Sequence, residues 1–119
     1  MAILTISVFA SAQFSGPESA LQLYHVAVLS NDGDRLSAVV LQDPESGSAR
    51  ELQVRVFNLM GVSEGIRVVS IERKGRSAIV TMGYFSAGFG QAFVPFYMVK
   101  PLSKWQIDTE LTIALLQSM

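Results

Sequence analysis

Two side chains in this sequence, His25 and Asp108, have the chemistry to move a proton in a reaction. His25 is the only histidine, and imidazole is the side chain whose ordinary pKa lies closest to neutral pH. Asp108 follows Trp105 and Ile107 in a predicted strand, where alternation turns its carboxylate away from whatever those two residues pack on. A histidine without an orienting carboxylate is more often a partly buried helix residue. His25 and Asp108 are therefore both weak catalytic candidates.

Four aromatic side chains, Tyr24, Tyr84, Tyr97 and Trp105, each combine an apolar body with a polar tip. Such side chains commonly line pockets for small ligands, and these four form the candidate ligand pocket. The alternative is that each of them packs in the core or in a dimer interface. No cofactor is expected, because Gly88-Phe89-Gly90 is too short for a phosphate loop and joins two predicted strands.

The composition excludes several kinds of chemistry. The chain has no cysteine, which excludes disulfides, thiol catalysis and cysteine-based metal sites, and there is no second histidine to share a metal ion. The net charge is −1 without a block of like charges, and the basic cluster Arg73-Lys74-Gly75-Arg76 falls in a predicted turn. We therefore expect no metal and no nucleic-acid partner.

The length and the apolar content predict one domain with apolar residues to spare. The chain has 119 residues, of which 50% are apolar and 16% are charged. A domain of this size has a limited interior, so part of the apolar surplus is expected to face a pocket or a partner.

Residues 1–12 are interpreted as a signal-like segment or an N-terminal extension. The apolar run from Ile3 to Phe9 closes on Ala10-Ser11-Ala12, which is the pattern that a signal peptidase reads, although no Lys or Arg precedes it. This pattern favours export to the periplasm or the medium. The alternative is an N-terminal strand or first helical turn that packs on the domain, in a cytoplasmic protein. No segment approaches the roughly 20 apolar residues of a membrane span.

Capping and turn signals predict three helices in the first half of the chain. Ser15-Gly16-Pro17-Glu18 begins a helix that ends near Ser30. Asp34 caps a short second helix that ends at Asp43-Pro44. Ser48-Ala49-Arg50-Glu51 is a capping box for a third, which stops at Gly61.

After the helices the apolar periodicity changes to two, which predicts an antiparallel meander of four strands. The expected strands are 65–73, 76–86, 91–100 and 105–112. Pro95 interrupts the third strand, so this strand carries a bulge or lies at an edge there. Both faces of the sheet are apolar. Helices can cover only one, so the other is expected to pair with a second copy of the sheet.

The order of these elements resembles the nuclear transport factor 2-like superfamily, the cone-shaped fold shared with ketosteroid isomerases and polyketide cyclases. The likeness lies in Pro17-Glu18-Ser19-Ala20, in Asp43-Pro44 and in Lys104-Trp105-Gln106-Ile107-Asp108, and spans residues 16–112. It implies an α+β fold in which N-terminal helices pack on a curved four-stranded antiparallel meander, a cystatin-like cone. Residues 13–119 would be a single domain of this kind, with a pocket at the wide end of the cone and pairing through the sheets.

The resemblance leaves two functions open, because this fold serves enzymes and non-enzymes alike. We expect a non-catalytic domain that binds a small apolar ligand or a protein partner as a homodimer. The alternative is a small enzyme of the isomerase or cyclase type with Tyr24, His25 or Asp108 in its pocket. Members that resemble ketosteroid isomerase require a general base and oxyanion donors inside the apolar cone, and the predicted strands supply few such groups.

Overall fold

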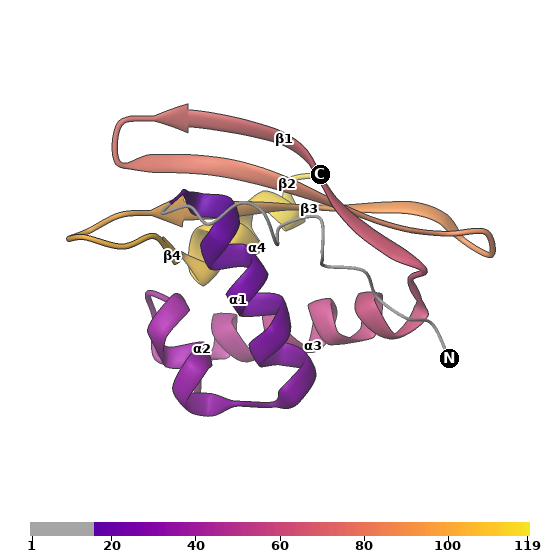
Figure 1. Cartoon of the computed structure of the whole chain (residues 1–119), viewed down its shortest axis with the longest axis horizontal. Helices are drawn as coiled ribbons and strands as arrows, with labels where there is room; N and C mark the ends of the chain where they lie inside the picture. Colours follow the sequence, from indigo (N-terminus) through magenta and orange to yellow (C-terminus); the bar gives the residue numbers. More distant parts are fainter. Residues whose placement is uncertain (1–15) are drawn as a thin grey trace.

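The computed structural model describes residues 16–119, and the signal-like segment 1–12 lies outside them. The described residues form an α+β fold of helices followed by an antiparallel sheet, with a further helix at the C-terminal end (Figure 1). The elements are α1 Pro17–Ser30, α2 Gly33–Val39, α3 Gly47–Val62, β1 Gly65–Lys74, β2 Ser77–Ser86, β3 Gly90–Val99, β4 Gln106–Ile107 and α4 Thr109–Gln117. None of the described helices is long and apolar enough to cross a membrane.

The predicted helices are present, but two of them begin slightly earlier than expected, and the second ends at Val39 rather than at Asp43-Pro44. Pro17 occupies the first turn of α1, and Asn31 ends that helix in the left-handed conformation. The cap of α2 is Asp32 rather than Asp34, because its side chain accepts the Arg35 backbone N–H at 3.2 Å. The cap of α3 is likewise Ser46 rather than Ser48.

The Ser48 hydroxyl is instead hydrogen-bonded to Thr109 Oγ1 at 2.8 Å, a contact 61 residues away along the chain. The third helix also continues through Gly61 to Val62. A glycine lowers helix propensity by only about 1 kcal/mol, so it does not by itself end a helix.

The sheet is the expected meander, with strand order β1-β2-β3-β4 and antiparallel neighbours. Pro95 keeps regular register opposite Thr81, and the bulge lies in β1 at Val69. The N–H of Tyr97, two residues on and therefore pointing the same way, donates to Thr112 Oγ1 of α4 at 2.9 Å. The missing N–H of Pro95 thus faces an edge where no strand of residues 16–119 pairs, in agreement with the edge alternative.

The predicted last strand, Trp105 to Thr112, is wrong over most of its length. Only Gln106–Ile107 pairs with β3, and α4 begins at Thr109. Asp108 caps this helix, because its side chain accepts the Leu111 N–H at 3.0 Å. The β-branched residues that suggested a strand are buried at helical spacing instead; they are Thr109, Thr112 and Ile113.

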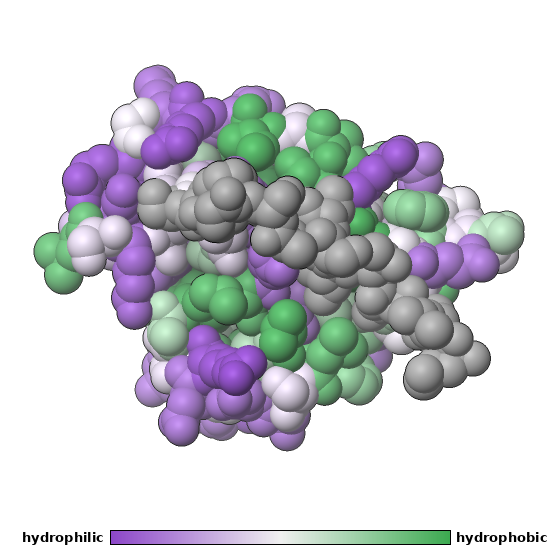
Figure 2. Space-filling model, in the orientation of Figure 1, coloured by the Kyte–Doolittle hydropathy of each residue, from purple (hydrophilic) through white to green (hydrophobic). Residues whose placement is uncertain are grey.

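The core lies between the helices and one face of the sheet. In Figure 1 the helices α1, α2 and α3 all lie on the same side of the strands. Most of the inner face is buried; its buried residues on the two central strands are Ala78, Val80, Met82 and Tyr84 of β2 and Val94, Phe96 and Met98 of β3. The surface retains apolar side chains on both the strands and the helices, as Figure 2 shows in the same orientation.

Candidate functional site

A polar cluster lies at the centre of the core, where α1 crosses the inner face of the sheet. His25 is completely buried, and its Nδ1 lies 2.7 Å from the carbonyl oxygen of Leu21. Its Nε2 lies 2.7 Å from the hydroxyl oxygen of Tyr84. A carbonyl oxygen can only accept, so the proton is on Nδ1 and the Tyr84 hydroxyl donates to Nε2.

Burial keeps this cluster uncharged. Loss of solvation lowers the pKa of His25 from 6.5 to about 4, against the smaller opposing effect of its bond to the Leu21 carbonyl. Burial likewise raises the pKa of Tyr24 and that of Tyr84 above the usual value of 10.0. The Tyr24 hydroxyl has no hydrogen-bond partner among the described residues.

Packing closes the cluster to small molecules. The Phe96 ring centroid lies 5.8 Å from that of His25 and 6.0 Å from that of Tyr24. The larger hollows between described residues are lined by neither His25 nor Tyr84. Among the described residues, none of these hollows reaches the imidazole.

Asp108 is engaged in holding the C-terminal helix to the rest of the domain. Its Oδ1 accepts from Gln42 Nε2 at 2.9 Å in addition to the Leu111 N–H. The same Gln42 accepts, through Oε1, from the Thr109 backbone N–H at 2.8 Å and the Thr109 hydroxyl at 2.9 Å. These contacts assign Asp108 a structural role at the start of α4.

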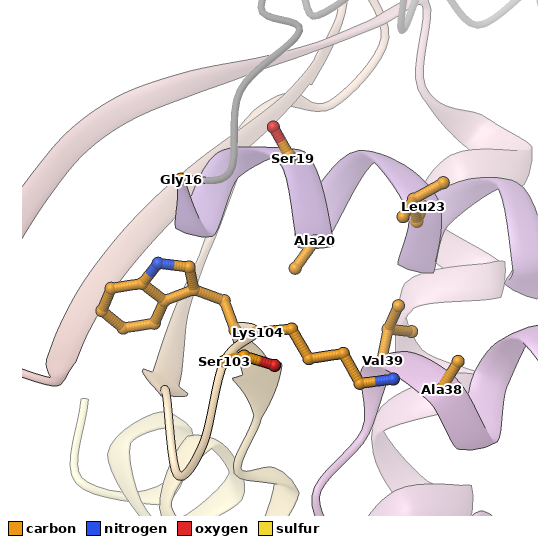
Figure 3. A pocket seen from close by; sticks show the side chains of 9 residues that line it. Gly16, Ser19, Ala20, Leu23, Ala38, Val39, Ser103 and Lys104 are labelled. Carbon is orange, nitrogen blue, oxygen red and sulfur yellow. The ribbon is translucent and has the colours of Figure 1, made fainter.

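A mainly apolar hollow forms a groove at the surface, with a volume of about 220 Å³ (Figure 3). Three segments line it: the start of α1, the end of α2 and the loop between β3 and β4. We call it the Trp105 groove; its residues are Gly16, Ser19, Ala20, Leu23, Ala38, Val39, Ser103, Lys104 and Trp105. In Figure 3 the Lys104 side chain extends along the groove toward Val39 and Ala38.

Backbone contacts hold the walls of the Trp105 groove together. The end of α2 is joined to β4 by the Leu41 N–H, which donates to the Ile107 carbonyl at 2.8 Å, and by a parallel bridge between Val40 and Ile107. The Arg76 guanidinium donates to the Leu102 carbonyl and so anchors the loop before Trp105. Residues distant in sequence thus form one preorganised groove.

Cations surround Trp105, which is 3% exposed. The guanidinium carbon of Arg73 lies 5.2 Å from the centroid of the Trp105 ring, and Lys100 Nζ lies 6.0 Å from it. The indole Nε1 is buried without a hydrogen-bond partner among the described residues. The groove therefore combines an apolar lining with nearby positive charge.

The predicted ligand pocket is not one pocket in the described structure. Tyr24 and Tyr84 are core residues beside His25, and Tyr97 is half-buried on the opposite face of the sheet. Only Trp105 lines the groove. Lys104 was not predicted as a groove residue. The sequence did offer a signal, because Lys100 and Lys104 both lie within five residues of Trp105, the only tryptophan.

The described residues contain no group of three His, Asp or Glu side chains that could hold a metal ion. Comparison with family models, with curated proteins and with solved structures found no match to this chain. The geometry of the described residues defines a small apolar groove with nearby cations, separate from a closed aromatic core.

Proposed function

We propose that this protein is a non-catalytic domain of the nuclear transport factor 2-like kind that forms a homodimer through the outer face of its sheet. One observation carries the proposal. The outer face exposes large apolar side chains, with Val69 47%, Phe85 36% and Phe93 40% exposed, on the side opposite α1, α2 and α3. Exposed apolar groups gathered on one face commonly mark an interface.

The outer face also suits a second copy of itself. Its β2 and β3 positions carry no charged side chain; they are Ser77, Ile79, Thr81, Gly83 and Phe85 of β2 and Gln91, Phe93, Pro95, Tyr97 and Val99 of β3. A two-fold dimer brings the same patch together from both subunits, so an uncharged patch avoids repulsion between like charges.

The local backbone helps to flatten this face. A Cβ placed on Gly83 would lie 2.8 Å from Cγ2 of Val69, so glycine lets the bulged β1 residue lie close over β2. Val69 therefore adds an apolar side chain of β1 to this face, beside Arg67, whose guanidinium carbon lies 5.4 Å from the centroid of the Phe85 ring.

The non-catalytic part of the proposal rests on the surroundings of the two candidates. His25 is sealed in the core, and Asp108 accepts from Gln42 and from the α4 backbone. No described hollow joins either side chain to a tyrosine hydroxyl. Export stays part of the proposal for residues 1–12, and N-terminal sequencing of the natively expressed protein tests it.

Light scattering after size exclusion tests the dimer. The wild-type protein at tens of micromolar is expected to have twice the 12.9 kDa mass of one chain. Phe93→Lys, which puts a charge at the centre of the face, is expected to give a monomer. The matched control Phe57→Lys alters a ring that is 52% exposed on α3 and should leave the dimer intact. A monomeric wild-type protein, or equal masses for the two variants, would contradict the proposal.

A further inference from the structure

The Trp105 groove has features of a binding site that the core does not share. Its volume of about 220 Å³ exceeds the roughly 150 Å³ of an apolar cavity that accepts benzene. Ala20, Leu23 and Val39 supply apolar walls. A body of roughly six to ten carbon atoms suits a hollow of this size.

The charges around the groove specify the other end of the ligand. Arg73 and Lys100 flank the Trp105 ring, and Lys104 lines the groove itself. None of the three forms an ion pair with a described residue, because the only ion pairs there are Arg35–Asp32 and Arg50–Glu45.

The Glu18 carboxylate lies near the groove. The Glu18 carboxylate folds against Gly16 in the first turn of α1, where the positive end of the helix dipole favours a negative charge. It forms no ion pair with Lys104. The far end of the groove, toward which Lys104 extends, thus carries a cation without a counterion in the described part of the chain.

We propose that the Trp105 groove binds a small amphipathic anion, a carboxylate on a short apolar chain, with its head group at Lys104 and its chain against Ala20, Leu23 and Trp105. This site is separate from the sheet face that forms the proposed dimer, so the ligand proposal and the dimer proposal can be refuted independently. The molecular mass tests the dimer, and ligand binding tests the groove.

Tryptophan fluorescence of the full chain tests the site, because Trp105 is the only tryptophan. Octanoate, titrated below its micelle concentration, is expected to produce a saturable change, and neutral octanol is expected to bind at least tenfold more weakly. Lys104→Glu should weaken octanoate binding tenfold or more. The matched charge reversal Arg55→Glu, on an exposed part of α3, should leave binding within twofold of wild type.

A filling variant separates the groove from other surfaces. Ala38 is an exposed residue that lines the groove, so Ala38→Phe can occupy the space without disturbing the core. We expect it to abolish the octanoate signal while leaving the unfolding transition and the dimer mass unchanged. The proposal is overturned if octanol binds as well as octanoate, or if Arg55→Glu weakens binding as much as Lys104→Glu. It also fails if octanoate gives no saturable change, as expected when another part of the chain or a second copy fills the groove.

Discussion

The two faces of the sheet differ in environment far more than in composition. On β3, Phe96 of the inner face is completely buried, whereas Phe93 of the outer face is 40% exposed. The inner side chains pack against helices of the same chain, and the outer ones do not face α1, α2 or α3. Apolar residues on the first face therefore contribute to folding, and those on the second remain available for association.

The largest expected effect comes from removing a ring on each face in turn. Phe96→Ala leaves a cavity in the core and should lower the free energy of unfolding by about 3–5 kcal/mol. Phe93→Ala should lower it by about 1 kcal/mol or less, because the ring is already partly solvated. Urea unfolding in dilute protein, where the result is independent of concentration, measures both. Equal losses of unfolding free energy in the two variants would contradict the conclusion that only the inner face contributes strongly to folding.

Acid should destabilise the inner face specifically through His25. Its pKa is about 4 in the folded protein and 6.5 ordinarily, so the unfolded chain takes up a proton at a higher pH than the folded one. The contribution of neutral His25 to the free energy of unfolding is fully present above pH 6.5 and is lost as the pH falls toward 4. The total loss is about 3 kcal/mol.

The variant His25→Gln keeps groups that can donate to the Leu21 carbonyl and accept from Tyr84 but cannot be protonated in this range. Its free energy of unfolding should therefore fall less steeply than that of wild type between pH 7 and pH 4. Carboxylates act equally in the two proteins and cancel in the comparison. Parallel pH profiles would refute the buried, neutral imidazole.

The smallest expected effect on stability comes from removing the hydroxyl of Tyr84 or of Tyr24, which belong to the same buried cluster. Tyr84→Phe removes the donor to His25 Nε2 and should cost about 1–3 kcal/mol by leaving that nitrogen unsatisfied. Tyr24→Phe removes a hydroxyl without a partner among the described residues and should leave stability equal or slightly higher. Thermal unfolding of the two variants makes the comparison, and a greater loss for Tyr24→Phe would show that its hydroxyl is satisfied.

Local signals were sufficient for the three N-terminal helices and the first three strands. The helix start at Pro17 and the turn at Gly75, which has a φ of 61°, depend on conformations that proline and glycine adopt by themselves. The C-terminal helix was missed because Thr109, Thr112 and Ile113 have β-branched side chains, which favour strands on propensity alone. The cap at Asp108 and burial against α3 and β3 overcome that preference.

The candidate site also separates what local sequence determines from what tertiary contacts determine. Sequence alone determined the α+β order, the apolar surplus and the inventory of groups that could do chemistry, since these follow from residue types and spacing. Tertiary structure alone decided that His25 meets Tyr84, 59 residues away, and that Trp105 lies in a groove with Ala20 and Ala38. Burial and long-range contacts set the pKa and the accessibility of a side chain, and neither is encoded in its immediate neighbours.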